Sequence, residues 1–402
     1  MIKKGLTSAF NPVCMKHHMT MLLVLALAVA TAMGQPVRPK SIRTGAEQVR
    51  ELVKIAGKLR IGLFANHTAR VGERHLLDTL LACGVNVTRI YSPEHGFRGD
   101  ADAGEDVGNT TDPKTGIAIV SLYGPSKKPS PEQLAAVDLV FFDMQDIGVR
   151  FFTYISSLHY MMEACARDGK TLVVLDRPNP NGGYVDGPVL KKEFRSFVGM
   201  HPVPIVHGMT LGEYAKMVNG EGWLEGGRKC ELRVVPVQGW RHGDPWAIPV
   251  KPSPNLTSDH AIRLYPSSCL FEGTSLSIGR GTHHPFEQAG HPKLKGRFDH
   301  SFTPVSIPGM SKTPPHQDQE CFGIDLRRQP ITDHIQLEHL ITMYKAYPEP
   351  DKFFISYFEK LAGTAELRQQ IISGMSAESI RAGWQPELEA FRKIRSRYLI
   401  YP

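Results

Sequence analysis

The chain has 402 residues, of which 41% are hydrophobic and 22% are charged, a composition typical of globular proteins and a length that suggests two or three domains. These values exclude an intrinsically disordered chain, a collagen-like repeat and a small disulfide-stabilised protein. The formal net charge of +7 is modest and the basic residues are spread evenly, so we expect no nucleic-acid partner.

An apolar stretch near the N-terminus is typical of a secretory signal peptide rather than a buried helix. It covers residues 21–32, follows a short basic stretch and leads to Gly34, where small residues occupy the positions that signal peptidase reads. The stretch is too short to cross a bilayer, which takes roughly 20 apolar residues. We therefore expect residues 1–34 to be a signal peptide cleaved near Gly34, with translation starting at Met1 or Met15. The exported protein is then periplasmic or extracellular, without a stable membrane anchor.

Short apolar segments alternate with amphipathic ones between residues 35 and 200. Five of them are rich in β-branched or aromatic residues and predict buried strands, at residues 60–65, 86–91, 117–122, 138–143 and 171–176. The clearest helix candidate spans residues 151–168, where apolar side chains recur every three or four positions. Strands that alternate with helices predict an α/β fold with a Rossmann-like, doubly wound parallel sheet covered on both faces. We expect this first domain to comprise residues 35–200.

The composition changes after residue 200. Thr210 followed by Glu213 forms a capping box and predicts a helix over residues 211–220. A stretch rich in proline and tryptophan then leads to a glycine-rich segment at residues 271–290, and most of the later chain has a helical pattern. We expect residues 201–402 to form a mixed α/β auxiliary domain, with an active site in the cleft between the two domains.

Unusual polar residues follow four of the five predicted strands. They are Asn66 after the first strand, Glu94, His95 and Arg98 after the second, Asp143, Asp146 and Arg150 after the fourth, and Asp176, Arg177 and Asn179 after the fifth. Ligands of an open parallel sheet bind beyond the carboxyl ends of its strands, so these side chains predict an active site at that edge. The glycine patterns of dinucleotide-binding proteins and P-loops do not follow the first strand, so we expect no nucleotide and no other cofactor.

The loop after the second strand carries the richest chemistry. Glu94 adjoins His95 and lies near Arg98, so its carboxyl group can be held protonated or ionised according to which neighbour faces it. The alternative is a solvated loop in which Glu94 caps a helix or pairs with Arg98. After the fourth strand, Asp143 ends a buried segment, whereas Asp146 can equally be a helix cap.

The glycine-rich segment of the second half contains Glu272, Arg280 and Glu287. Dense glycines allow the backbone to approach a ligand closely, and Arg280, between two glycines, can hold an anionic substituent. The alternative is a mobile surface loop. The histidines nearby raise the question of a metal; they are His283, His284, His291 and His300. Adjacent histidines cannot readily share one ion and no His-x-x-x-His spacing is present, so we expect no metal.

Several long and uncommon segments together resemble a known glycosidase family. They are SPEHGFRGDADAGE, DLVFFDMQDIGVRFFTYISSLHYMMEAC, LDRPNPNGGYVDGPVL, VGMHPVPIVHGMTLGEYAKMVNGEGWL, SPNL, LFEGTSLSIGRGT and PFEQ. In this order they are similar to the NamZ-type exo-β-N-acetylmuramidases, formerly a domain of unknown function, and the similarity runs from about Gly45 to the C-terminus. The resemblance implies a Rossmann-like domain plus an auxiliary domain, and an exo-acting hydrolase that releases β-linked N-acetylmuramic acid from the non-reducing ends of peptidoglycan fragments. It also implies that Glu94 is catalytic, with His95 beside it.

Glycoside hydrolysis needs a proton donor and a second group that acts as base, nucleophile or orienter of the substrate's acetamido group. We expect Glu94 to be the general acid. Candidates for the second group are, in order, Asp143, Asp146, Glu272 and Glu287. If the acetamido group itself attacks the anomeric carbon, no protein nucleophile is needed, so retention and inversion both stay open.

The lactyl carboxylate of muramic acid calls for a cation, and the candidates are Arg280, Arg150 and Arg177. We expect Asn66, Arg98, Asp176 and Asn179 to contribute further substrate contacts. The partners expected are therefore muramic-acid glycosides derived from peptidoglycan. Two rival hypotheses are an exported wall-sugar binder without catalysis and a metal-dependent hydrolase that uses the histidine-rich stretch.

Overall fold

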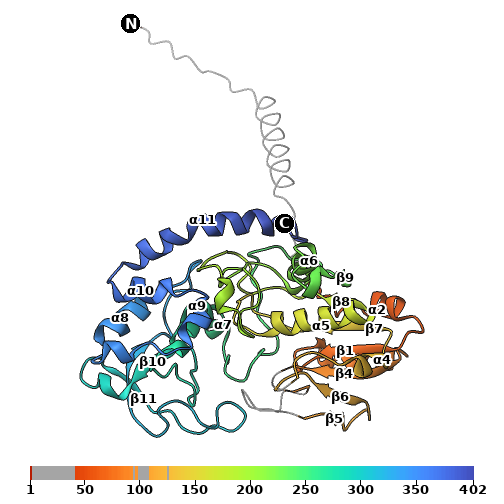
Figure 1. Cartoon of the computed structure of the whole chain (residues 1–402), viewed down its shortest axis with the longest axis horizontal. Helices are drawn as coiled ribbons and strands as arrows, with labels where there is room; N and C mark the ends of the chain where they lie inside the picture. The colour runs from red at the N-terminus through yellow and green to blue at the C-terminus, as the bar shows by residue number, and fades with distance from the viewer. Residues whose placement is uncertain (2–40, 94–95, 98–107, 125) are drawn as a thin grey trace. The chain divides into compact units, whose positions relative to one another are not determined.

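Seven strands form the main sheet of the structure, a computed structural model that describes residues 1, 41–93, 96–97, 108–124 and 126–402 (Figure 1). Across the sheet they lie in the order β5 (Thr110–Thr111), β6 (Ala118–Ser121), β4 (Val87–Ser92), β1 (Ile61–Ala65), β7 (Leu139–Asp143), β8 (Thr171–Leu175) and β9 (Glu231–Val235). All neighbouring strands are parallel except β5 and β6, which pair antiparallel at one edge. The five predicted strands are confirmed as β1, β4, β6, β7 and β8, each within one residue at either end.

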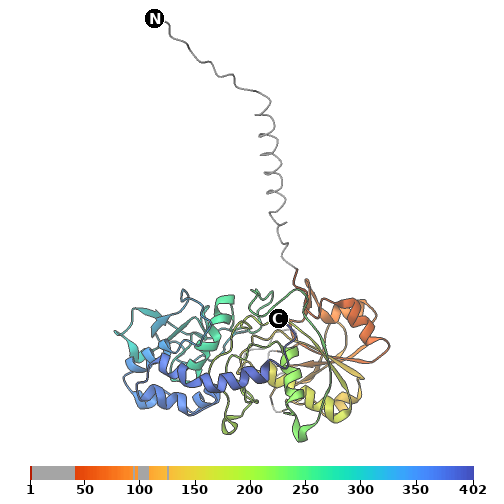
Figure 2. The same ribbon diagram turned by 90° about the horizontal axis from the view of Figure 1, so that it is seen from above.

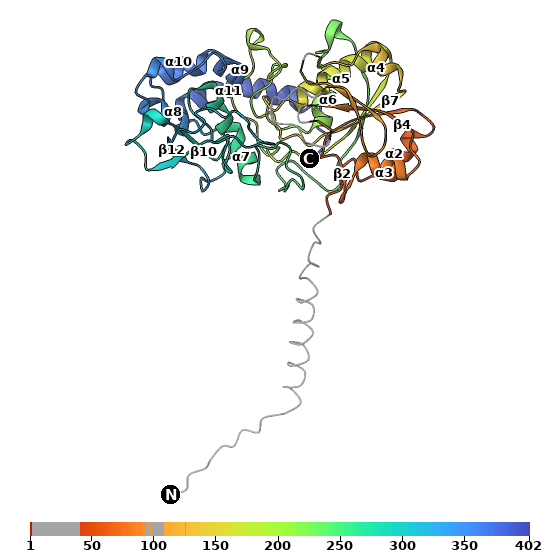
Figure 3. The same cartoon turned by 90° about the horizontal axis from the view of Figure 1, so that it is seen from below.

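Helices cover both faces of this sheet (Figure 3). One face packs against α2 (Val49–Ala56) and α3 (Leu76–Ala82), and the other packs against α4 (Pro131–Ala135), α5 (Tyr154–Asp168) and α6 (Leu211–Gly220). Successive strand side chains point to opposite faces, so Phe141 joins the core under α2 and α3 while Phe142 joins the core under α5. The predicted doubly wound α/β fold is confirmed.

Local sequence signals set the ends of the long helices. The predicted helix at 151–168 is α5, which begins at Tyr154 and ends at Asp168; Gly169, which follows, has the left-handed conformation with φ of 63°. The predicted capping box at the start of α6 is present: the Glu213 N–H donates to Thr210 Oγ1 at 3.3 Å, and the Thr210 N–H donates to the Glu213 carboxylate at 3.0 Å.

The main sheet does not end at the domain boundary expected between residues 200 and 201. Strand β9 pairs in parallel with β8 over five residue pairs, and α6 packs on the same face of the sheet as α5. Both elements follow residue 200, because the chain leaves the sheet after β8 and returns to add one more strand at its edge. The Rossmann-like layer is thus longer in sequence than the expected domain.

The remaining chain builds a smaller mixed α/β region, as predicted. A two-stranded ribbon, β2 (Arg70–Val71) and β3 (Arg74–His75), follows β1, and a three-stranded antiparallel sheet lies in the later chain. Its strands are β10 (Gln288–His291), β12 (Cys321–Asp325) and β11 (His300–Phe302). The accompanying helices are α7 (Asp259–Ser268), α8 (Glu338–Ala346), α9 (Phe358–Ala362), α10 (Glu366–Ile372) and α11 (Ala377–Arg395). Short 3-10 turns are η1 (Lys192–Phe194), η2 (Glu225–Gly227), η3 (Cys269–Gly273), η4 (Pro292–Leu294) and η5 (Pro350–Lys352).

The long helix α11 brings the C-terminus back to the main sheet (Figure 2). After it, the hydroxyl of Tyr401 donates to Asp176, which follows β8, at 2.6 Å. One hydrophobic cluster also runs without a break from Phe64 in β1 to Trp384 in α11. The smaller region therefore shares a packed core with the sheet. No helix within the described ranges combines the length and apolar character needed to span a membrane.

Candidate active site

Asn66 stabilises the turn that follows β1. Its Oδ1 accepts hydrogen bonds from the backbone N–H and the hydroxyl of Thr68, at 3.0 and 2.6 Å, and its Nδ2 donates to the Tyr154 hydroxyl at 2.9 Å. The Tyr154 hydroxyl donates in turn to the carbonyl oxygen of Pro252 at 2.9 Å. Asn66 is fully buried, so in this structure it positions the turn and Tyr154 and does not face a ligand.

A segment between β9 and α7 lies across the ends of β1 and β7. We name residues 246–252 the crossing segment. Its Lys251 carbonyl lies 2.8 Å from His67 Nε2, and its Trp246 indole N–H donates to Gln145 Oε1 at 3.2 Å. The carboxyl edge of the sheet is therefore overlaid by chain that comes from beyond the sheet, as the predicted interdomain site requires.

Asp143 and Arg177 form a bidentate ion pair at this edge. Arg177 Nε donates to Asp143 Oδ1 at 2.6 Å and Arg177 Nη2 donates to Asp143 Oδ2 at 2.9 Å. Burial of Asp143, which is complete, raises the pKa of its carboxyl group, and the Arg177 guanidinium opposes that rise. Because both carboxylate oxygens are taken, Asp143 holds Arg177 in place and is not free to act on a substrate in this structure.

A cavity of about 150 Å³ opens beside Arg177. It is also lined by Thr44, Glu47, Thr68, Arg70, Gly72, Glu73, Gln145, Trp246, Ile248, Pro249 and Val250. The prediction of polar residues at the strand ends identified Arg177 but missed Glu47, Arg70 and Glu73. Arg70 and Glu73 lie directly after the first predicted strand, so their position in the chain was the signal available. Nothing in the local sequence marks Glu47, which precedes that strand.

Asp146 and Asn179 stabilise the loop after β7. Asp146 Oδ2 accepts from the Gly148 N–H at 2.6 Å, whereas among the described residues no group hydrogen-bonds to Asp146 Oδ1. Burial raises the pKa of Asp146 to about 7. Asn179 is buried against the same turn, and its Nδ2 donates to the Met209 carbonyl at 3.0 Å. Asp146 thus caps a turn, which is the alternative that the sequence left open.

Arg150 and Asp176 were expected to bind substrate, and the structure instead places both in the core. The fully buried guanidinium of Arg150 donates to four backbone carbonyl oxygens, those of Pro188, Val203, Leu361 and Ala362. Asp176 is equally buried and accepts from the Thr210 and Tyr401 hydroxyls, and burial raises its pKa to about 6. The physical reason is that each satisfies backbone or helix-terminus groups that the fold buries. Neither side chain is accessible to a ligand in this structure.

The loop between β4 and β5, which carries the predicted general acid, is described only in part. Glu94, His95 and Arg98 lie outside the described residues. On one side, the Ser92 carbonyl accepts from the Leu122 N–H at 2.8 Å. On the other, the Phe97 ring contacts the His75 ring at a centroid distance of 4.7 Å. Ser92, before Glu94, and Phe97, after it, are therefore both held near the carboxyl edge of the sheet.

Glu272 and Arg280 form a second ion pair, in the glycine-rich segment. Arg280 Nε donates to Glu272 Oε1 at 2.5 Å, and the guanidinium lies 5.1 Å from the Phe286 ring centroid. The Arg280 side chain is 24% exposed and the Glu272 side chain is 21% exposed, whereas the Asp143–Arg177 pair is buried. Within the described part of the chain, neither Nη group of Arg280 donates a hydrogen bond. A partly exposed guanidinium with free donors can bind a carboxylate.

Aromatic side chains link this ion pair to the loop after β7. The Tyr265 ring lies 4.8 Å from Phe286 on one side, and 5.5 and 6.1 Å from Phe151 and Phe152 on the other. Phe152 in turn packs 4.8 Å from Tyr154, which bonds to the turn after β1. A continuous set of packed rings therefore connects Arg280 to the carboxyl edge of the sheet.

Glu287 and the neighbouring histidines have structural contacts. Glu287 accepts from the Ser258 hydroxyl at 2.8 Å and from His260 Nδ1 at 3.0 Å, and so fixes the start of α7. His300 contacts Gln288, and the His291 ring packs on Tyr347. Across the described residues, no three histidine, cysteine or acidic side chains gather as metal ligands would.

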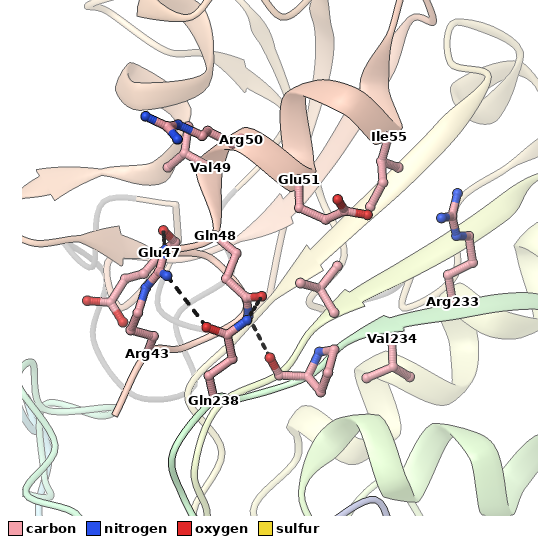
Figure 4. Close-up of a pocket in the computed structure, with 12 residues that line it drawn as sticks. Arg43, Glu47, Gln48, Val49, Arg50, Glu51, Ile55, Arg233, Val234 and Gln238 are labelled. Carbon is pink, nitrogen blue, oxygen red and sulfur yellow. Dashed lines mark hydrogen bonds between the residues drawn. The ribbon is translucent and has the colours of Figure 1, made fainter. Parts of the chain in front are cut away.

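A larger cavity of about 810 Å³ lies between α2 and the edge strand β9 (Figure 4). Gln48 spans it, donating to the Pro236 carbonyl at 2.6 Å and accepting from Gln238 Nε2 at 2.8 Å. Glu47 is the one residue that this cavity shares with the cavity beside Arg177. The larger cavity, between α2 and β9, is lined by no residue that the sequence analysis predicted for the site.

The fold and the site define an α/β protein whose polar residues gather at the carboxyl edge of a parallel sheet, beneath a crossing segment and beside a second region. Family models described as "Exo-beta-N-acetylmuramidase NamZ, N-terminal" and "C-terminal" match residues 61–260 and 263–401. The chain belongs to the NamZ family of exo-β-N-acetylmuramidases, which are glycosidases.

Relatives span nearly the whole chain. The peptidoglycan β-N-acetylmuramidase NamZ of Bacillus subtilis (strain 168) is 38% identical over 94% of this chain and 96% of its own length. A crystal structure of a DUF1343 family protein from Bacteroides fragilis NCTC 9343 has a TM-score of 0.84 and 45% identity, covering 90% of this chain and 99% of that chain. A second such protein from the same organism has a TM-score of 0.76 and 30% identity, covering 91% and 100%.

Proposed function

We propose that this chain is an exo-acting glycosidase that releases β-1,4-linked N-acetylmuramic acid from the non-reducing ends of peptidoglycan fragments. The observation that carries the proposal is the match of both NamZ family models, which together span residues 61–260 and 263–401. The Bacillus subtilis relative, which aligns over 94% of this chain, is a peptidoglycan β-N-acetylmuramidase, and this supports the same substrate. The cavity beside Arg177, at the carboxyl edge of the sheet, supports this location for the reaction.

The proposed chemistry begins with proton donation by Glu94. Its carboxylic acid gives a proton to the glycosidic oxygen as the bond from that oxygen to the anomeric carbon breaks, and water finally supplies the hydroxyl of the released sugar. The contacts of Ser92 and Phe97, which flank Glu94 in the chain, support its location near the carboxyl edge. Retaining, inverting and acetamido-assisted routes share this first requirement.

We assign the second carboxylate to Glu272 rather than to Asp143. Asp143 is fully buried and has both oxygens on Arg177, and Asp146 caps a turn. Glu272 accepts from Arg280 Nε and from Cys269 Sγ, but its side chain, unlike that of Asp143, stays 21% exposed. Its partner Arg280 presents guanidinium donors to which the lactyl carboxylate of muramic acid can bind.

We further propose that the enzyme acts outside the cytoplasm after cleavage near Gly34. The support is the apolar stretch at residues 21–32 and its flanking residues, together with the location of peptidoglycan. Expression of the full chain in a bacterial host, cell fractionation and N-terminal sequencing of the exported product test this. A product that keeps residues 1–34 in the cytoplasm would contradict it.

Purified protein tested against chromogenic β-glycosides separates the proposed function from its rivals. We expect release of the chromophore from the β-N-acetylmuraminide and much less from the β-N-acetylglucosaminide. Binding without release would favour the wall-sugar binder, and loss of turnover after exhaustive chelation would favour the metal-dependent hydrolase. We expect turnover to be unchanged after chelation, because no group of three potential metal ligands is found among the described residues.

A further inference from the structure

A separate cavity of about 380 Å³ lies beyond the predicted site. Three segments build it: residues 190–195 after β8, residues 200–202, and residues 222–223 after α6. We name it the platform cavity. It shares no lining residue with the cavity beside Arg177, and none of its residues takes part in the proposed reaction. Its volume is within the range of cavities that hold small ligands.

Two stacked rings line this cavity. The rings of His201 and Trp223 lie with centroids 5.0 Å apart and planes inclined by only 17°. Trp223 is half-buried, whereas His201 is 1% exposed. The stacking on His201 holds the Trp223 indole, a flat and largely apolar ring of the kind that packs against one side of a small ring.

A chain of hydrogen bonds fixes the His201 ring from behind. The Tyr214 hydroxyl donates to His201 Nδ1 at 2.9 Å, and His201 Nε2 donates to His159 Nδ1 at 3.0 Å. His159 Nε2 then donates to Glu163 Oε1 at 3.0 Å. Burial and the neighbouring His159 hold the pKa of His201 well below its usual value, so the ring is neutral. The surface is therefore preorganised before any ligand arrives.

The rim of the platform cavity is positively charged. Lys192 and Arg195, on η1 and directly after it, both line the cavity and are exposed. Neither forms an ion pair or a side-chain hydrogen bond with a described residue. Among the described lining residues there is no aspartate or glutamate. The rim therefore favours a ligand that carries negative charge.

We propose that the platform cavity is a second binding site for a monosaccharide that carries a carboxylate. The sugar ring lies on Trp223, and the carboxylate meets Lys192 and Arg195. This identification of the sugar as N-acetylmuramic acid rests on the proposed function, which makes that compound the product. The peptide attached to muramic acid in peptidoglycan also carries carboxylates, but it has no sugar ring to pack on Trp223. The site holds product or a muramic-acid chain end apart from the reacting edge.

Tryptophan indole resonances allow this site and the reacting edge to be observed separately. The chain has four tryptophans, of which Trp223 lines the platform cavity and Trp246 bonds to Gln145 at the sheet edge. The Trp223→Phe and Trp246→Phe variants assign the two signals. Free N-acetylmuramic acid is titrated into the Glu94→Gln protein, with N-acetylglucosamine and L-Ala-D-isoglutamine as comparison probes.

We expect N-acetylmuramic acid to shift the Trp223 signal, and N-acetylglucosamine to shift it at least about tenfold more weakly. The double substitution Lys192→Glu, Arg195→Glu lowers the affinity measured at Trp223 at least about tenfold, while Arg328→Glu, at an exposed arginine elsewhere, leaves it unchanged. Hydrolysis of a small chromogenic muraminide by the double variant stays within about twofold of the parent, since neither residue belongs to the reacting edge.

Three results would overturn the inference while leaving the glycosidase intact. They are a Trp223 signal that does not move at millimolar sugar, a shift that survives the double charge reversal, and an equal shift with the dipeptide. Failure of the proposed function is seen differently, as a parent protein that does not hydrolyse the muraminide. A shift at Trp246 alone would place all muramic-acid binding at the sheet edge and would also overturn the second site.

Discussion

Arg177, at the end of β8, holds both oxygens of Asp143, at the end of β7, through hydrogen bonds of 2.6 and 2.9 Å. Asp143 is completely buried and Arg177 is 7% exposed, so the pair joins two neighbouring strands where their loops diverge. The pair also fixes one wall of the cavity that Arg177 lines. Its main role is to hold the sheet edge in shape.

Breaking this pair should therefore damage stability first. Arg177→Met leaves the Asp143 carboxylate buried without a partner, and we expect the free energy of unfolding to fall by about 3–5 kcal/mol in urea titrations. Removing both charges, as Asp143→Asn with Arg177→Met, should cost less than Arg177→Met alone. Arg327→Met, which breaks the exposed pair with Asp325, should cost at most about 1 kcal/mol. Equal costs for the buried and exposed pairs would contradict this role.

Asp146 should make stability depend on pH in an unusual direction. Burial raises the pKa of its carboxyl group from 3.8 to about 7, so between these pH values the folded protein keeps a proton that the unfolded chain has released. The contribution of Asp146 to the free energy of unfolding thus falls as pH rises from about 4 to about 7, and is constant above that range.

The variant Asp146→Asn removes this contribution, because an amide cannot ionise but can still accept the Gly148 N–H. We expect the variant to gain stability relative to the parent by the order of a few kcal/mol as pH rises from about 4 to about 8. Asp176, whose pKa burial raises to about 6, stays in both proteins and cancels in the comparison. A difference that is flat with pH, measured by urea unfolding, would show that Asp146 is ionised in the folded protein.

Arg280→Ala should reveal how the lactyl group is recognised. We expect kcat/KM for a muraminide to fall at least about tenfold, and for the matching glucosaminide much less, since only the first carries a carboxylate. Arg368→Ala is a matched control, because Arg368 also pairs with a glutamate, Glu359, and lies over a ring, Phe354. Equal losses on both substrates with Arg280→Ala would rule out the proposed anchor.

Gly148 makes the turn after β7 possible. Its φ is +74°, and a Cβ there would lie only 2.1 Å from Asn179 Nδ2. Gly148→Ala should therefore lower the free energy of unfolding by well over about 1 kcal/mol. Gly116→Ala has a similar φ of +73° but open space around its Cβ, and should cost only the backbone strain. Similar melting temperatures for the two variants would mean that the Asn179 contact yields freely.

The main sheet could be predicted from the sequence because its strands are buried on both faces. Continuous apolar runs such as residues 138–143 and 171–176 need no tertiary information to be recognised. Strand β9 was missed because it lies at the sheet edge, where Glu231 and Arg233 interrupt the apolar pattern and only three of its residues are partly or fully buried. The sheet therefore continues past residue 200, where we expected the first domain to end.

The site was predicted less well because a polar residue at a strand end can face inward as well as outward. Position along the chain placed Asp143, Asp146 and Asp176 at the correct edge. It could not show that partners from distant segments, such as the Thr210 and Tyr401 hydroxyls on Asp176, turn these carboxylates into the core. Glu272 and Arg280 pair with each other within the glycine-rich segment, and their side chains stay partly exposed.

The most direct test of proton donation by Glu94 compares two substrates with different leaving groups, using the Glu94→Gln variant. A general acid matters when the departing oxygen is basic, so the variant should lose at least about 10²-fold in kcat/KM on a muramic-acid–sugar glycoside and far less on a dinitrophenyl muraminide, whose leaving group needs no proton. Glu132→Gln, at an exposed residue of α4, should change neither rate. Equal losses on the two substrates, or no loss on either, would contradict Glu94 as the proton donor.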